Sequence, residues 1–218
     1  MDIIQDLESR LAAAPVVPLI GASDTGVAVE TARALDAGGL SVIEVVLRTD
    51  EAVDCMEAIV KETSGCIVGA GTVLTVAQAE EVIARGAEFV VCPGLVDEVA
   101  EYCLSRSVPL YAGTMTAGEV QRAYALGLRT VKFFPASLAG GVPMLKALSS
   151  VFRDMRFMPT GGVSAANLAE FLALPSVIAC GGSWLTPASE IAAGNFEAIT
   201  QLAREAVAIG QQTRPSET

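Results

Sequence analysis

Residues 42–49 read VIEVVLRT, a short β-branched run that is too brief for a helix and typical of a buried strand. Seven further runs of this kind occur along the chain, and the starts of successive runs lie roughly 20 to 26 residues apart. That spacing is about the length of one strand, one loop, a three-turn helix and a return loop. The other runs are VVPLI from Val16, CIVGA from Cys66, FVVC from Phe89, VPLYA from Val108, TVKFF from Thr130, MRFMP from Met155 and VIACG from Val177.

The segments between these runs have helical patterns, for example TGVAVETARALDAGG and SAANLAEFLAL, and residues 1–15 form an amphipathic pattern of their own. The strand runs are continuously apolar, which indicates a sheet covered on both faces. We therefore predict a single-domain α/β fold, a (β/α)8 TIM-type barrel over residues 1–209 that includes an N-terminal helix, followed by a disordered tail at 210–218. A doubly wound open sheet is the alternative, but it usually has fewer strands and a dinucleotide fingerprint.

The composition disfavours several classes of partner. The chain has 218 residues, 52% of them hydrophobic, which is enough for one sizeable core and short for two domains. Its net charge of −11, with scattered basic residues, disfavours nucleic acid. No uninterrupted apolar run reaches ~18 residues, so we expect no contact with a membrane. The first residues lack the pattern of a signal peptide.

Rare residue types narrow the chemistry. The five cysteines form no C-x-x-C pair, and we expect them to be reduced thiols in a cytoplasmic protein. Histidine is absent, which rules out a Ser-His-Asp triad and the histidine-bearing sites typical of zinc catalysis. Covalent and acid-base chemistry therefore falls to Lys, Glu, Asp, Tyr or Cys.

Lys132 lies inside the apolar run TVKFFP, whereas the other two lysines, Lys61 and Lys146, lie in helical segments. Burial disfavours the ammonium form and lowers the pKa of a lysine, which makes the amine a usable nucleophile near neutral pH. Such an amine attacks carbonyl groups to give a Schiff base. The alternative is a lysine that extends to the rim of the barrel or forms an ion pair there.

Glu44 places a carboxylate in the middle of another apolar strand. Because strand side chains alternate, Glu44, Val46 and Arg48 share one face. If that face is the interior, Glu44 and Lys132 enter one cavity from different strands and can act as acid-base group and nucleophile. A buried ion pair that only holds the barrel together is the alternative.

Two glycine clusters, PTGGVS and GGSWL, follow the seventh and eighth runs. In TIM barrels these two loops frequently bind phosphate, because backbone N–H groups and the N-terminus of a short extra helix converge on the anion. The segment TPASEIAAG could supply that helix, and turns without a ligand are the alternative. The candidate phosphate-binding residues are Gly161, Gly162, Gly181, Gly182 and Ser183.

Small and polar residues follow the third and fourth runs, in GAGTV and CPGL. Thr72 could donate a hydrogen bond to a ligand carboxylate, and Arg48 could pair with the same group through two parallel hydrogen bonds. Helix capping or solvation at the rim is the alternative for both. Together with Pro93, these residues leave room for a small ligand.

Taken in order, PVVPLI, VIEVVLRT, VGAGTVL, CPGL, VKFFPA, PTGGVS and GGSWL resemble the family of 2-dehydro-3-deoxy-6-phosphogluconate (KDPG) aldolase and 4-hydroxy-2-oxoglutarate aldolase. The likeness extends from Pro15 to Val207. It implies a class I aldolase, usually a homotrimer, that uses neither metal nor cofactor and cleaves KDPG to pyruvate and glyceraldehyde 3-phosphate. The LRT after Glu44 favours the gluconate-type enzyme over its galactonate-type relative.

The resemblance also implies a role for each matching residue. Lys132 corresponds to the Schiff-base lysine, and Glu44 to the general acid-base group, which acts through a water molecule. Arg48 and Thr72 correspond to the residues that hold the pyruvate carboxylate. The remaining counterparts are Pro93 and Phe134, which line the site, Thr160 beside the substrate, and Gly161, Gly162, Gly182 and Ser183 around the phosphate.

Three alternatives remain open at this point. The substrate can be 4-hydroxy-2-oxoglutarate, cleaved to pyruvate and glyoxylate, or the galactonate epimer of KDPG. A phosphosugar isomerase or epimerase on the same barrel would use Glu44 as a base without a covalent step. A non-catalytic module would bind a phosphometabolite and keep Lys132 and Glu44 as a buried pair. The position of Lys132 in its strand favours the Schiff-base enzyme.

Overall fold

The computed structural model describes residues 3–214, in which helices and strands alternate along the chain. The strands are β1 (Val16–Ile20), β2 (Val42–Val46), β3 (Ile67–Gly71), β4 (Phe89–Val91), β5 (Leu110–Tyr111), β6 (Gly113–Thr114), β7 (Thr130–Phe133), β8 (Arg156–Pro159) and β9 (Cys180–Gly182). The helices are α1 (Ile3–Ala13), α2 (Thr25–Ala37), α3 (Ala52–Glu62), α4 (Val76–Ala84), α5 (Asp97–Ser105), α6 (Ala117–Ala125), α7 (Gly141–Val151), α8 (Leu168–Leu172), α9 (Ala188–Ala192) and α10 (Phe196–Thr213), with a 3₁₀ turn, η1 (Ser183–Leu185), between β9 and α9.

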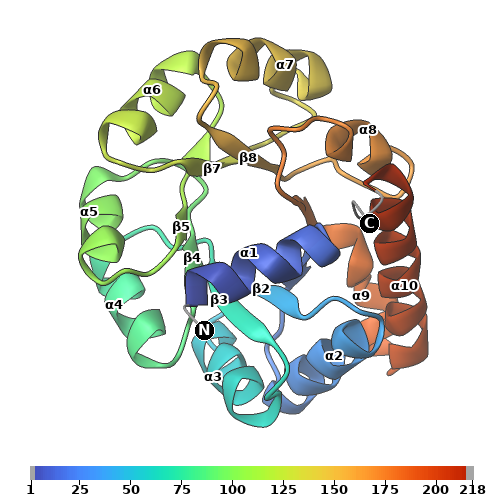
Figure 1. Ribbon diagram of the computed structural model, residues 1–218. Coiled ribbons are helices and arrows are strands. Elements are labelled where there is room, and N and C mark those ends of the chain that lie inside the picture. The colour runs from blue at the N-terminus through green and yellow to red at the C-terminus, as the bar shows by residue number, and fades with distance from the viewer. Residues whose placement is uncertain (1–2, 215–218) are drawn as a thin grey trace.

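The fold is α/β with curled parallel sheets. Six strands pair in the order β5-β4-β3-β2-β1-β9, and three more in the order β6-β7-β8. All of the pairings are parallel, and the strands lie around a common axis with helices outside them (Figure 1). The predicted α/β class is therefore confirmed. One continuous eight-stranded ladder is not seen, because only the isolated bridges Phe157–Val177 and Thr160–Gly181 join β8 to the β9 segment.

The fifth predicted strand, VPLYA, is divided in the structure. β5 pairs with β4, whereas β6, two residues further on, pairs with β7. Between them, the carbonyl oxygen of Ala112 accepts a hydrogen bond from Lys132 N at 2.9 Å. The chain changes partners here, and the Gly113 position is so crowded that an added Cβ would lie 2.0 Å from the carbonyl oxygen of Pro93.

The strand predicted in VIACG begins later than expected. β9 starts at Cys180, so the first residues of VIACG belong to the preceding loop. The short helix expected in TPASEIAAG is present as α9, but η1 comes first and begins directly at Ser183. The backbone after β9 thus turns at once into a tight helical turn.

Two apolar layers hold the strands. The outer layer packs strand residues such as Ile43 and Val45 against the surrounding helices. The inner layer lies on the axis and joins alternate strand residues such as Val42 to Leu7 and Leu11 of α1. Leu7 and Leu11 are four residues apart, so they lie on one face of α1, which covers the end of the sheet where the strands begin (Figure 1). The expected N-terminal helix is confirmed.

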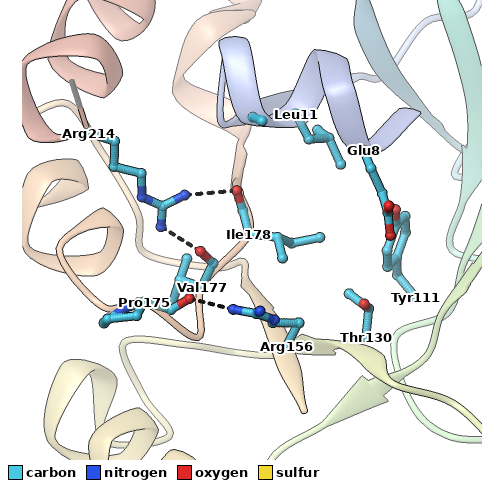
Figure 2. A pocket seen from close by; sticks show the side chains of 10 residues that line it. Glu8, Leu11, Tyr111, Thr130, Arg156, Pro175, Val177, Ile178 and Arg214 are labelled. Atoms are coloured by element: carbon cyan, nitrogen blue, oxygen red, sulfur yellow. Dashed lines mark hydrogen bonds between the residues drawn. The ribbon is translucent and has the colours of Figure 1, made fainter. Parts of the chain in front are cut away.

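The predicted disordered tail is wrong at its start. α10 continues through Gly210 to Thr213. The Arg214 guanidinium then donates to the carbonyl oxygens of Leu172, Leu174, Val177 and Ile178, and Figure 2 shows the bonds to Val177 and Ile178. Helical hydrogen bonds and these side-chain bonds order a segment whose polar composition indicates disorder. Residues 215–218 lie outside the described part of the chain.

None of the helices in residues 3–214 combines the length and apolarity needed to cross a lipid bilayer. The five cysteines are free thiols, and all of them except Cys66 are buried.

Candidate active site

Lys132 and Glu44 meet inside the ring of strands, as the sequence predicts. Lys132 is the third residue of β7 and is 5% exposed, and Glu44 is the third residue of β2 and is fully buried. The distance between Lys132 Nζ and Glu44 Oε1 is 3.7 Å, and this is an ion pair rather than a good hydrogen bond. The ring of Phe134 lies beside the amine, with its centroid 5.2 Å from Nζ.

The Glu44 carboxyl group has two properties that favour proton transfer: its oxygens accept no hydrogen bond from the described residues, and its pKa is raised. Neither Oε1 nor Oε2 accepts a hydrogen bond from a described residue, although both atoms are buried. Burial raises the pKa of Glu44 above its ordinary value, and the charges of Lys132 and Arg48 oppose that shift without cancelling it. A carboxyl group with a raised pKa and no hydrogen bond to its oxygens is a candidate for proton transfer.

Alternation along β2 explains why Glu44 points inward. Val42 belongs to the inner apolar layer, and side chains two residues apart share a face of a strand. The neighbouring strand leaves room for the carboxyl group, because a Cβ on Gly71 would lie 2.0 Å from Glu44 Oε1. A glycine at the end of β3 is therefore needed to accommodate Glu44.

Arg48 and Thr72 lie in the loops that follow β2 and β3. Arg48 is exposed, and its guanidinium makes no hydrogen bond or ion pair with a described residue, although its charge reaches Glu44. Thr72 has a φ of 62°, a left-handed conformation that costs about 1–3 kcal/mol for a residue other than glycine. Such backbone strain is common at ligand-binding sites and supports the prediction that Thr72 contacts a ligand.

Pro93 and Thr160 border the same interior. Pro93 is half-buried after β4 and packs closely on Gly113 through its carbonyl oxygen. Thr160 is 4% exposed and forms the bridge to Gly181. A Cβ at Gly181 would lie 2.3 Å from Thr160 Oγ1, so this glycine makes room for the threonine in addition to its predicted role.

The two glycine loops lie next to each other, as expected. Gly161 and Gly162 have φ values of 94° and 77°, and Gly182 lies under the ring of Trp184, where an added Cβ would be 2.6 Å from Cζ3. Ser183 is exposed at the start of η1. The Thr160–Gly181 bridge joins the two loops, so backbone N–H groups from both loops can serve one anion.

The sequence did not predict two residues beside the glycine loop after β8, Ser137 and Asn167. Ser137 Oγ and Asn167 Nδ2 both donate to the carbonyl oxygen of Gly162, each at 2.9 Å. Ser137 follows the VKFFPA motif and Asn167 precedes α8, and no spacing pattern connects either of them to residue 162. Only the fold brings the three together.

A separate cavity of about 350 Å³ lies at the opposite end of the strands, between α1 and the starts of β7 and β8. Figure 2 shows Arg156, Arg214 and Glu8 on its walls. None of the predicted site residues lines it. Within residues 3–214, no three His, Cys, Asp or Glu side chains gather in a way that would hold a metal ion.

A buried lysine beside a carboxyl group, on curled parallel sheets whose loops carry paired glycines, is typical of enzymes that form covalent bonds to carbonyl compounds. The family model for KDPG and KHG aldolase, where KHG is 4-hydroxy-2-oxoglutarate, matches residues 7–202. The chain belongs to this family, whose members are lyases.

Individual relatives agree with that assignment. The KHG/KDPG aldolase of Escherichia coli K12 is 48% identical over 200 residues, which are 92% of this chain and 94% of that protein. A crystal structure of the Zymomonas mobilis aldolase with 3-phosphoglycerate is 40% identical, with a TM-score of 0.87 over 94% of this chain and 96% of that one. In the Legionella pneumophila KDPG aldolase, pyruvate was captured as a covalent carbinolamine; that structure is 39% identical, with a TM-score of 0.88 over 91% and 97%.

Proposed function

We propose that this chain is a class I aldolase that cleaves KDPG to pyruvate and glyceraldehyde 3-phosphate through a Schiff base on Lys132. The observation that carries the proposal is the buried Lys132 amine, 3.7 Å from a fully buried Glu44 carboxyl group. A covalent pyruvate adduct in the Legionella pneumophila relative supports the same chemistry.

The reaction begins when Lys132 Nζ attacks the C2 carbonyl carbon of the substrate. Loss of water gives an iminium ion, which accepts the electron pair of the C3–C4 bond as that bond breaks. Glyceraldehyde 3-phosphate leaves, and the enamine that remains is protonated at C3. Hydrolysis of the new iminium then returns the free lysine and pyruvate.

Glu44 moves the protons. Acting through a water molecule, its carboxylate takes the proton of the C4 hydroxyl group as C3–C4 cleavage begins, and the carboxyl group then returns a proton to C3 of the enamine. The raised pKa of Glu44 strengthens the carboxylate as a base for the first of these steps. Neither of its oxygens accepts a hydrogen bond from a described residue, which leaves both positions available for this exchange.

The loops would hold the two anionic ends of the substrate. Arg48 and Thr72 bind the carboxylate next to C2, and Pro93, Phe134 and Thr160 surround the carbon chain. The phosphate lies over the paired glycine loops, on Gly161, Gly162, Gly181, Gly182 and Ser183. The left-handed backbone of Gly161 and Gly162 supports this subsite.

The same site suits 4-hydroxy-2-oxoglutarate, which shares the 2-keto acid group and the C4 hydroxyl group but ends in a carboxylate and carries no phosphate. The family name includes this substrate, and we infer a second activity that yields pyruvate and glyoxylate. The galactonate epimer of KDPG is a third candidate. A phosphosugar isomerase that uses Glu44 as a base is less well supported, because its reaction would not need the buried Lys132 amine beside that carboxyl group.

Reduction with borohydride in the presence of pyruvate tests the covalent step. The wild-type protein should gain the mass of one pyruvic acid less one oxygen atom, located on Lys132 by peptide mapping. Lys132→Met should give no adduct and should reduce kcat for KDPG by more than about a thousandfold. Lys146→Met, which removes an exposed lysine from α7, serves as the control and should behave like the wild type.

Retention of substantial cleavage by Lys132→Met would contradict the proposal, as would a reduced adduct located on another lysine. A chelator that abolished activity would contradict the expectation that the reaction needs no metal or other cofactor.

We also infer that the two sheets form one closed (β/α)8 barrel, with β5 and β6 as a single interrupted strand. The bridges from β8 to the β9 segment and the bond from Lys132 N to Ala112 O support closure on the two sides. A homotrimer and a cytoplasmic location remain predictions, the first from the family resemblance and the second from the cysteine content. Light scattering in solution would measure the oligomeric state.

A further inference from the structure

The loop after β8 is held by two side chains that the chemistry at Lys132 does not use. Ser137 Oγ, from the loop after β7, donates to the carbonyl oxygen of Gly162 at 2.9 Å. Asn167 Nδ2, from the turn before α8, donates to the same oxygen at 2.9 Å. Two separate segments therefore fix the direction of the peptide that joins residues 162 and 163.

The two preceding carbonyl groups point the same way. Thr160 O accepts from Ala136 N at 2.8 Å, and Gly161 O accepts from Ser137 N at 3.0 Å. The C=O and N–H of a trans peptide point in opposite directions, so the N–H groups of residues 161, 162 and 163 face away from the loop after β7. The N–H groups of residues 162 and 163 donate to no acceptor within residues 3–214, whereas residue 161 adjoins the Thr160–Gly181 bridge.

These N–H groups face the other glycine loop. β8 has β7 on one side and the Thr160–Gly181 bridge on the other, so a group turned away from the β7 loop faces Gly182 and Ser183. Residue 162 must be glycine in this arrangement, because its φ is 77° and an added Cβ would lie 2.3 Å from Ser137 Oγ. Its lack of a side chain lets Ser137 reach the carbonyl group.

We propose that Ser137 and Asn167 are positioning residues for the phosphate group of a phosphorylated substrate. They hold the Gly162 carbonyl on one side of the loop and thereby aim the N–H group of residue 163 at the phosphate on the other side, beside the N–H group of residue 162. Aligned N–H groups attract anions through their partial positive charges. This inference rests on the proposed function for the identity of the substrate.

Ser137→Ala and Asn167→Ala test the idea through a comparison of two substrates. KDPG carries a phosphate group and 4-hydroxy-2-oxoglutarate does not. For each variant, KM for KDPG should rise about three- to tenfold, the effect of one lost hydrogen bond, with kcat little changed. KM for 4-hydroxy-2-oxoglutarate should stay within about twofold of the wild type.

Ser150→Ala is the matched control, because the Ser150 hydroxyl also donates to a backbone carbonyl, at 2.7 Å, but does so on the exposed face of α7. It should change KM for neither substrate. A melting temperature close to that of the wild type would establish that each variant is folded.

A binding measurement makes the inference independent of turnover. The dissociation constant of 3-phosphoglycerate, which the Zymomonas mobilis structure contains, can be measured by calorimetry and should rise about three- to tenfold in both variants. An unchanged dissociation constant, or an equal rise of KM for both keto acids, would overturn the inference. If the wild type cleaved neither keto acid while the variants still lost affinity for 3-phosphoglycerate, the proposed function would be wrong and the positioning roles would stand.

Discussion

At the scale of single residues, the fully buried carboxyl group of Glu44 is costly to ionise in the folded protein. Its pKa is raised by burial above the ordinary value of 4.5, so the folded state binds its proton more tightly than the unfolded state does. The stability that this group contributes is therefore complete below pH 4.5 and is lost as the pH rises through the folded-state pKa.

Glu44→Gln removes that pH dependence. The free energy of unfolding of the variant minus that of the wild type should increase as the pH rises from 4.5 towards neutral, measured by urea denaturation at several pH values. Glu197→Gln removes the same negative charge from an exposed position on α10 and separates net charge from burial. A difference that fell with pH would show that the folded-state pKa of Glu44 is not raised.

Lys132 and Glu44 could be predicted from sequence because a charge inside a short apolar run has few structural explanations. The 3.7 Å distance and the unpaired oxygens of Glu44 could not, since they depend on two strands that are far apart in the chain. Ser137 and Asn167 have no such signal, because a serine two residues after a proline and an asparagine before a helix are ordinary loop residues. Their role depends on the peptide geometry of a loop in another segment.

At the scale of elements, Arg214 fastens the end of α10 to the loops around α8 and β9. Its guanidinium donates to four carbonyl oxygens, so Arg214→Ala would leave four acceptors without this partner. We expect a loss of about 2–3 kcal/mol in the free energy of unfolding, since hydrogen bonds from charged donors are individually worth about 1.5–3 kcal/mol and this site is partly solvated. Thermal and urea denaturation would measure the change.

Arg204→Ala is the control on the same helix. Arg204 is half-exposed and 3.6 Å from exposed Glu197, a surface pair worth about 0–1 kcal/mol. Equal destabilisation by the two variants would mean that Arg214 is no more than another surface charge.

The element boundaries differ in how far sequence could predict them. β1 and β2 begin where the apolar runs begin, because a buried strand and a continuous apolar run coincide there. The division of VPLYA could not be predicted, since it reflects a change of pairing partner at Ala112 rather than a change of residue type. The helical start of the tail was missed because bonds from a single arginine outweigh polar composition.

At the scale of the whole molecule, the strands are not equally joined. β2 pairs with β3 at five positions, whereas β8 meets the β9 segment only at two isolated bridges. Separation of β8 from β9 breaks fewer hydrogen bonds than separation of β2 from β3, so local opening between β8 and β9 should require less free energy. The boundary between β8 and β9 is therefore the expected weak point of the ring.

Hydrogen exchange can measure this difference at matched amides. Leu47 N–H donates to Gly71 O at 2.9 Å beside the β2–β3 pairing, and Ile178 N–H donates to Phe157 O at 2.9 Å at the weak boundary. The Ile178 amide should exchange at least about tenfold faster. Equal protection of the two amides would mean that the ring opens only as a unit.

The arrangement of the two chain ends has a practical consequence. α1 covers the end of the sheets where the strands begin, and Arg214 is bound at that same end (Figures 1 and 2), whereas the loops that follow the strands lie at the other end. A tether attached near either end of the chain would thus fix the molecule to a bead or an electrode with the loops that follow the strands turned outward. Immobilised in this orientation, the catalyst could be washed continuously with keto acid and aldehyde without its support blocking their entry.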